Sequence, residues 1–188
     1  YYQPDNATLI VAGKFDEQKA LDYIGEYFSA IPRPQRVLEK TYTVEPAQDG
    51  ERSVELKRSG DVQYIAALYH TVATVDEDYP ALDVLLEILQ SDPSGYLYKA
   101  LVESKKASSV FCFQPTVHDP GYAYFGVEVA KDKSLDSAKN ALIKALDAIP
   151  STAYTEQDLR RGISKVVKQI ESVTNNTVGF AINLTEYI

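Results

Sequence analysis

The sequence contains few of the side chains that carry chemistry, with two His, one Cys, no Met and no Trp among its 188 residues. The single Cys, Cys112, excludes an internal disulfide framework and any zinc site built from several cysteines. His70 and His118 are too far apart in the chain to form a local metal-binding motif. Because the first residue is Tyr1 and not Met, we expect the sequence to be a piece of a longer protein, with any targeting segment outside it.

Charge and hydropathy exclude two large classes of partner. The formal net charge is −8 at neutral pH. Nucleic acids and anionic membranes both require a basic surface on the protein, so neither is expected as the main partner. The longest apolar stretches, such as Ile65–Tyr69, are far shorter than the roughly 20 residues that span a bilayer, so no membrane span is expected either.

The first fifty residues predict a strand, a helix and a linker. Thr8–Gly13 is an apolar run with β-branched residues, closed by glycine, which is typical of a buried strand. Asp16 is placed to cap a helix that must end before Pro32 and that carries apolar residues at helical spacing, namely Leu21, Ile24 and Phe28. Residues 33–50 are mostly polar, include two prolines and show little periodicity, so we expect an extended linker.

The following residues predict a sheet. Val54 and Leu56 alternate with charged residues in a short strand, and a turn at Ser59–Asp61 leads to a longer strand over Val62–Thr71. This longer strand is apolar on both faces, which predicts a sheet covered by helices. Two further strands, which we expect to form a hairpin or to lie side by side, are Val110–Gln114 and Tyr122–Ala130.

Apolar residues at helical spacing predict several helices among and after these strands. One helix is capped by Asp78 or a neighbour, is interrupted at Asp92–Gly95, and then resumes. Ser134 caps the next helix, and Thr155–Asp158 resembles a capping box that opens a long helix, which Gly179 is expected to bend or break. The order of elements, without strict alternation, predicts an α+β fold in which helices pack against a mostly antiparallel sheet.

The remaining residues contain no motif of a catalytic or nucleotide-binding site. A catalytic or ligand role is conceivable for His70 and His118, but neither has a Cys, Ser or second His at motif spacing, so we interpret both as structural. Ser94 cannot form a nucleophile elbow because Asp92 stands where the first Gly is required. Asp76–Asp78 could bind a hard cation, although a solvated helix start explains it better. The 14 Tyr are interpreted as packing residues.

Several short sequence segments, in a definite order and spacing, resemble those of a known family over nearly the whole chain. They are Tyr2–Asp16, Tyr27–Pro34, Gly50–Arg52, Asp78–Leu85, Leu97–Glu103 and Asp119–Gly121. Together they resemble the pitrilysin/insulinase family of zinc peptidases, with its LuxS/pitrilysin-like α+β architecture. The resemblance implies that residues 1–32 are the closing strand and helix of a preceding homologous domain. Residues 33–50 are then the linker, and residues 51–188 are a second α+β domain, incomplete at its C-terminus.

The resemblance implies zinc chemistry in the parent protein but not in this chain. The catalytic signature of the family, His-x-x-Glu-His followed by a later Glu, is absent. The signature belongs upstream of the strand with which this chain starts. We therefore expect zinc in the parent protein, and no catalytic residue, metal ligand or bound zinc in this chain. A family member that has lost its zinc would show the same absence.

A second motif of the family is altered at two positions. The half that lacks zinc typically carries Leu-Arg-x-Lys-x-x-Leu-Gly-Tyr, whose Arg and Tyr contact the substrate. Here Val102 replaces the Arg and Ser109 replaces the Tyr, so neither of these substrate contacts can be made. We therefore expect no substrate-binding residue at these positions and assign the chain to the zinc-bearing half. Drift in a purely structural domain is the alternative.

The function implied by the resemblance is that of a non-catalytic, chamber-forming domain in a zinc metalloendopeptidase that degrades or processes peptides. Its partners would be a peptide substrate, the upstream zinc domain, and a second homologous half in the same chain or in a partner subunit. Bacterial relatives of this kind are often exported, which favours the periplasm over the cytoplasm. The alternative is a non-proteolytic scaffold or assembly subunit of the same family. A third hypothesis is a free-standing peptide-binding domain.

Overall fold

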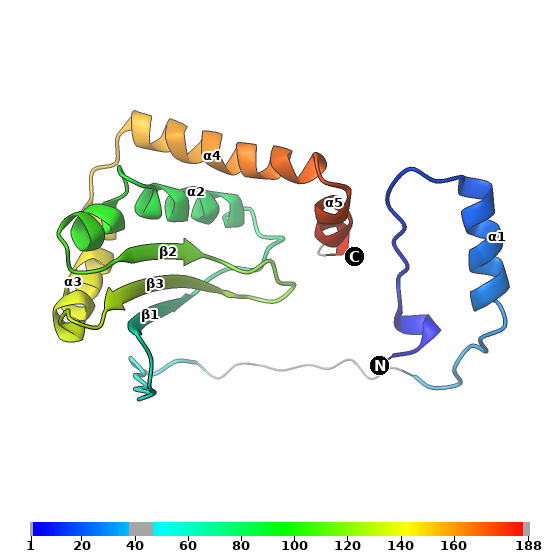
Figure 1. Ribbon diagram of the computed structural model, residues 1–188, viewed down its shortest axis with the longest axis horizontal. Helices are drawn as coiled ribbons and strands as arrows, with labels where there is room; N and C mark the ends of the chain where they lie inside the picture. The colour runs from blue at the N-terminus through cyan, green and yellow to red at the C-terminus, as the bar shows by residue number, and fades with distance from the viewer. Residues whose placement is uncertain (1, 38–46, 186–188) are drawn as a thin grey trace. The chain divides into compact units, whose positions relative to one another are not determined.

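The computed structural model describes residues 2–37 and 47–185 (Figure 1). Part of the predicted linker, residues 38–46, lies outside the described residues. Arg58–Ser172 form one compact unit, and the described parts of Tyr1–Lys57 and Val173–Ile188 form another. The predicted division into segments 1–32, 33–50 and 51–188 stays a prediction. The two units are described separately below.

The unit Arg58–Ser172 contains a three-stranded antiparallel sheet (Figure 1). Its strands are β1 (Val62–His70), β2 (Ser109–Phe113) and β3 (Tyr122–Ala130). The order across the sheet is β1-β3-β2, so the last strand in sequence lies in the centre and pairs with both others. Together with the helices this arrangement confirms the predicted α+β fold and the three strands of this region.

The helices of this unit follow one another in the order that the sequence predicts. They are α2 (Tyr79–Gln90), the π-helical η2 (Tyr98–Glu103), α3 (Leu135–Asp147), the short η3 (Ile149–Ser151) and α4 (Glu156–Thr174). Two predicted caps are confirmed. Ser134 Oγ accepts a hydrogen bond from the Ser137 N–H at 3.2 Å. Thr155 and Asp158 each donate a backbone N–H to the other's side chain, at 2.9 and 3.1 Å, which is the reciprocal capping box.

The start of α2 is stabilised by the neighbour of its N-cap residue. Asp78 occupies the cap position but makes no side-chain cap hydrogen bond. The Asp76 carboxylate accepts from the Asp78 N–H at 3.0 Å instead, and the Asp76 carbonyl accepts from the Tyr79 N–H. The acidic run therefore serves the entry into the helix, as negative charge at a helix N-terminus is expected to do.

The apolar core lies between one face of the sheet and the helices. The buried residues are Leu86, Leu89, Leu97, Leu101, Cys112, Ala123, Phe125, Val127, Val129, Ala138, Leu142 and Leu146. Within the described unit, α2 packs on β2, and α3 packs on β1 and β3. The alternate residues of β3 that point to this side are buried, whereas the alternate residues of β1 on the opposite side are exposed. The prediction that helices cover both faces is therefore wrong: the described helices of this unit cover one.

Two glycines bring backbone segments close together in this unit. A Cβ on Gly95, in the turn between α2 and η2, would lie 2.5 Å from the Leu89 carbonyl oxygen. A Cβ on Gly162, in α4, would lie 2.9 Å from a side-chain carbon of Ile88 and 3.1 Å from the Val84 carbonyl oxygen. The absence of a side chain at Gly162 therefore lets α4 lie directly against α2.

The second unit contains η1 (Pro4–Asn6), α1 (Glu17–Phe28) and α5 (Thr177–Leu184). The predicted helix after Asp16 is confirmed, and the Asp16 carboxylate accepts from the Lys19 N–H at 3.0 Å. No residue of α1 is buried among the described residues. Within that same described region, no helix is long and apolar enough to cross a bilayer.

Three sequence predictions for this part of the chain are wrong. No described strand pairs with Thr8–Gly13, where Leu9 and Val11 are about half exposed, and none forms around Val54 and Leu56, which are mostly exposed. An extended run becomes a strand only where another strand supplies its hydrogen bonds, and no described segment does so here. The long helix breaks before Asn176, whose side chain caps α5, and not at Gly179.

Candidate functional site

Within the unit Arg58–Ser172, the described helices leave one face of the sheet uncovered, and this face carries several exposed aromatic and aliphatic side chains. Its residues occupy the even-numbered positions of β1 and β3 and the odd-numbered positions of β2; this set is called the open face below. Across the strands, Tyr64 pairs with Glu128, and Leu68 pairs with Tyr124. Tyr64 and Leu68 are 60% and 57% exposed. The open face is thus apolar and accessible, which is uncommon for the surface of a single domain.

Four aromatic rings form a continuous layer on the open face. Phe111 and Tyr124 stack with centroids 5.6 Å apart and an interplanar angle of 21°. Tyr124 also stacks on Phe113 at 5.0 Å and 22°, and Phe113 meets the ring of Tyr122 edge-on at 6.4 Å. We call Phe111, Phe113, Tyr122 and Tyr124 the aromatic layer. Such pairs stabilise one another beyond their buried area, so the layer has a defined shape.

The layer depends on a glycine in the central strand. Gly126 lies opposite Phe111, and a Cβ built on Gly126 would lie 2.3 Å from the Phe111 ring and 2.6 Å from the Tyr124 ring. The Phe111 ring therefore lies across the backbone of β3 at a position where any other residue would push it away. The aromatic surface at this position therefore lies close to the sheet, and the ring does not project away from it.

A single permanent charge lies beside this layer. Among the strand positions of the open face, Glu128 is the one Asp, Glu, Lys or Arg residue. Its carboxylate has no hydrogen-bond or ion-pair partner within residues 2–37 and 47–185. It is half-buried, with Tyr64 opposite it on β1 and Ser109 opposite it on β2. The open face therefore combines apolar rings with one unpaired negative charge.

The two altered motif positions lie in η2 and at the first residue of β2. Val102 lies in η2 and is partly buried, and its carbonyl accepts a hydrogen bond from the Lys105 N–H at 2.9 Å. Lys105 has a φ of 59°, which turns the chain out of the helix toward β2. Ser109 is the first residue of β2 and lies on the open face. That these residues make no substrate contact stays a prediction.

The histidines and the acidic run do not converge on a metal site. His70 ends β1 and pairs with Tyr122, whereas His118 lies in the loop between β2 and β3, 3.4 Å from Asp119 and almost fully exposed. Over the described ranges of the chain, no group of three His, Cys, Asp or Glu side chains is placed to hold a metal ion. These residues therefore do not fit the zinc that a peptidase of this family would require.

A small cavity of about 190 Å³, lined by polar and apolar side chains, lies between α2, β2 and α4. Gln114 is buried and donates to the Tyr79 carbonyl at 3.0 Å and to the Asp83 carboxylate at 2.8 Å. Burial raises the pKa of Asp83, which the hydrogen bond from Gln114 partly opposes. Cys112 borders the same cavity, and burial, with a smaller contribution from the charge of Glu87, raises its pKa to about 12. The polar groups that line the cavity therefore bond to one another and hold α2 on β2.

Cys112 is predicted to be unreactive in the folded chain. With a pKa of about 12, roughly 1 in 10,000 thiols is ionised at pH 8, and only the thiolate attacks disulfides. We expect the reaction with a chromogenic aromatic disulfide to be at least about 100-fold slower in the folded chain than in urea. After unfolding, one thiol per chain should react. Equal rates in the two states would contradict the buried position of Cys112.

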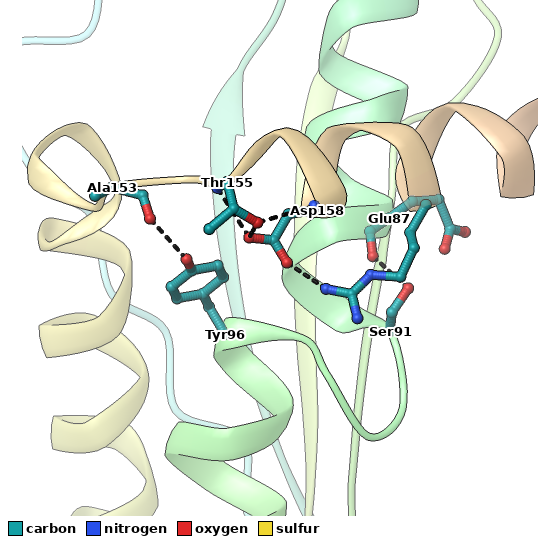
Figure 2. A network of polar contacts seen from close by, with 7 residues as sticks. Glu87, Ser91, Tyr96, Ala153, Thr155 and Asp158 are labelled. Carbon is teal, nitrogen blue, oxygen red and sulfur yellow. Dashed lines mark hydrogen bonds and ion pairs between the residues drawn. The ribbon is translucent and has the colours of Figure 1, made fainter.

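Helix α4 is held on α2 by polar contacts between their side chains. Lys165 of α4 lies 2.8 Å from Oε2 of Glu87, a residue of α2 that is 7% exposed. Oε1 of Glu87 accepts from the side chains of Gln90 at 3.2 Å and Gln169 at 3.0 Å. At the beginning of α4, Asp158 accepts from Thr155 and Arg161, and these hydrogen bonds lower its pKa (Figure 2). The network fixes the helix layer behind the sheet and leaves the open face free.

The fold and the site define a class of protein: an α+β domain with an exposed sheet face and no metal-binding group among its described residues. Residues 1–166 match the family model of the peptidase M16 inactive domain. The chain belongs to this family. The predicted resemblance to the non-catalytic domain of a zinc-peptidase family is thereby confirmed.

Individual relatives agree with this assignment. The chain is 24% identical to the zinc protease PqqE of Helicobacter pylori over 178 residues, which are 93% of this chain and 40% of that protein. A solved inactive peptidase domain from Bordetella parapertussis is 34% identical, with a TM-score of 0.62 and coverage of 71% of this chain and 73% of that one. A solved protease from H. pylori has the same fold, with 24% identity, a TM-score of 0.87, and coverage of 100% and 46%. The chain thus spans less than half the length of both H. pylori proteins.

Neither the aromatic layer nor the role of Glu128 was predicted from the sequence. Tyr122 and Tyr124 were interpreted as packing residues, as most tyrosines are. The available signal was the alternation of aromatic residues in two strands that were expected to pair, with a glycine, Gly126, in one of them. Alternation of this kind marks one face of a sheet, but only the register shows that the rings meet.

Proposed function

We propose that this chain is a non-catalytic, chamber-forming domain of a zinc metalloendopeptidase, and that its open face forms part of the wall against which a peptide lies. The observation that carries this proposal is the match of residues 1–166 to the inactive domain of a peptidase family. The likeness to a zinc protease supports zinc chemistry in the parent protein. An accessible apolar sheet face supports contact with polypeptide.

The zinc would be held by another domain of the parent protein. The described side chains of this chain offer no three-ligand group, so its contribution would be shape and binding. When bound in the parent, zinc would supply an activated water for hydrolysis. The loss of the family Arg and Tyr at Val102 and Ser109 supports a place in the zinc-bearing half, with a second homologous half as partner. A bacterial periplasmic location remains part of the proposal.

The 188-residue chain alone is predicted to be inactive. We expect less than about 0.1 zinc per chain after incubation with zinc and desalting, because the described ligand set cannot fill a tetrahedral site. We also expect no cleavage of a mixed fluorogenic peptide library above the rate in buffer. Metal analysis and fluorescence measure the two quantities. One tightly bound zinc per chain would contradict the assignment.

The gene that encodes this chain offers the test that separates an enzyme from a scaffold. We expect it, or a neighbouring gene for a partner subunit, to encode His-x-x-Glu-His with a later Glu. In the purified parent, changing the first Glu of that motif to Gln should abolish peptide cleavage without loss of zinc. If no such motif is present, the non-proteolytic scaffold function is the correct one and the peptidase proposal fails.

A further inference from the structure

We propose that the open face binds an extended peptide segment in which a Lys or Arg lies two residues from an aromatic or large aliphatic side chain. The inference rests on the proposed function, which supplies the peptide, and adds the chemistry that the peptide must carry. It follows from three features of this sheet: the aromatic layer, the unpaired charge of Glu128, and the spacing between them.

The aromatic layer determines the apolar part of the ligand. Phe111, Phe113 and Tyr122 are 38%, 44% and 38% exposed, and they stack on or against Tyr124 or one another. Because Gly126 has no side chain, the Phe111 ring lies low over the backbone and leaves room above the sheet. A flat set of ring faces binds another ring or a large aliphatic side chain by stacking and by removing apolar surface from water.

Glu128 determines the charged part of the ligand. The strand positions of the open face carry one carboxylate and no Lys or Arg, and that carboxylate has no partner in the described part of the chain. A cation approaching it gains the ion pair and lies next to Tyr64, which is paired with Glu128 across the strands and can add a cation–π contact. A second carboxylate approaching the same place would meet an unpaired like charge. Charge complementarity therefore selects a Lys or Arg.

The distance along β3 between Glu128 and the aromatic layer sets the spacing of the charged and apolar side chains in the peptide. Glu128 lies two residues from Gly126, above which the Phe111 ring lies, and two residues of a strand cover about 7 Å. Side chains at positions i and i+2 of an extended peptide project from the same side at the same interval. A peptide lying along β3 can therefore place a cation at Glu128 and a ring on the aromatic layer together.

The experiment uses the absence of Trp from this chain. The probe is the capped peptide Gly-Lys-Ser-Trp-Ser-Lys-Gly, whose symmetric sequence allows either direction along the strand. Excitation above the tyrosine absorption reports only the Trp of the peptide. Titration with the 188-residue chain at low salt should show saturable binding. The same peptide with Glu in place of both Lys should bind at least about fivefold more weakly.

Two variants locate the binding on the open face. Glu128→Lys should lower affinity for the Lys peptide by at least about fivefold and raise affinity for the Glu peptide. Asp147→Lys is the matched control, because it makes the same change in net charge on an exposed residue of α3, and it should leave the ratio of the two affinities unchanged. Tyr124→Leu should weaken both peptides, because it removes the ring that stacks on Phe111 and Phe113.

Several results would overturn the inference. The inference is wrong if the unaltered chain binds the Lys and Glu peptides with equal affinity. It is also wrong if the Lys peptide shows no saturable binding. Equal effects of Glu128→Lys and Asp147→Lys would show that net charge, and not this face, selects the peptide. Self-association that Tyr124→Leu abolishes would show that a second copy occupies the face. None of these results bears on whether the parent carries the zinc motif.

Discussion

Replacement of Gly95 by Ala is expected to destabilise the unit Arg58–Ser172 by about 3 kcal/mol or more. The added Cβ would lie 2.5 Å from the Leu89 carbonyl oxygen, 2.6 Å from the Ser91 nitrogen and 2.8 Å from the Gln90 carbonyl carbon. All three are backbone atoms at the end of α2, so no side chain can rotate away to relieve the contact. The turn must therefore open, and Leu97 and Leu101, which follow it and are fully buried, must shift with it.

Urea denaturation followed by circular dichroism measures this loss as a fall in the midpoint at an unchanged slope. The control is Ser94→Ala, which alters the preceding residue by removing one oxygen and adds no atom to the turn. It should change the free energy of unfolding by less than about 0.5 kcal/mol. If Gly95→Ala were as stable as Ser94→Ala, the close approach of the turn to α2 would be incorrect.

Elements that depend on local interactions were predictable from the sequence. Ser134 and the pair Thr155 and Asp158 interact with backbone groups three residues away, so their side chains reveal where α3 and α4 begin. The bounds of the strand Tyr122–Ala130 were predictable because Pro120-Gly121 marks a turn before it and Lys131 follows its last apolar residue. The family of the domain was also predictable, because the resemblance rests on several sequence segments in a fixed order and not on single residues.

Elements that depend on distant partners were not predictable. Thr8–Gly13 and the residues around Val54 have the composition of strands, but a strand also needs a neighbour that supplies hydrogen bonds, and composition does not show whether one exists. The same limit applies to β1, whose apolar residues on both sides suggested two covered faces. The described helices of its unit pack against one of them.

The candidate site depends on register more than on composition. Phe111 and Gly126 are 15 positions apart in sequence, and only the pairing of β2 with β3 places the ring over the glycine. The place of Glu128 in the candidate site likewise depends on its pairing with Tyr64, which lies on a strand far away in the sequence. A sequence without an alignment of relatives contains the alternation but not the register, which is why the aromatic layer was missed.

Replacement of Lys165 by Met is expected to cost about 2 to 3 kcal/mol, and replacement of Glu87 by Gln only about 1 kcal/mol. The two partners differ in burial: the Glu87 side chain is 9% exposed and the Lys165 side chain 47%. Without Lys165, the buried carboxylate of Glu87 has only the amides of Gln90 and Gln169 as side-chain donors. Without the charge on Glu87, Lys165 can turn into water at little cost.

The asymmetry itself is the test of how α4 is attached to α2. The double variant Glu87→Gln with Lys165→Met should be more stable than Lys165→Met alone, because the second change removes the charge that the first leaves uncompensated. Denaturation of the four proteins in a double-mutant cycle measures this difference. Equal costs for the two single changes would mean that Glu87 is hydrated. In that case the packing of Gly162 against Val84 and Ile88, and not the buried ion pair, would hold α4 in place.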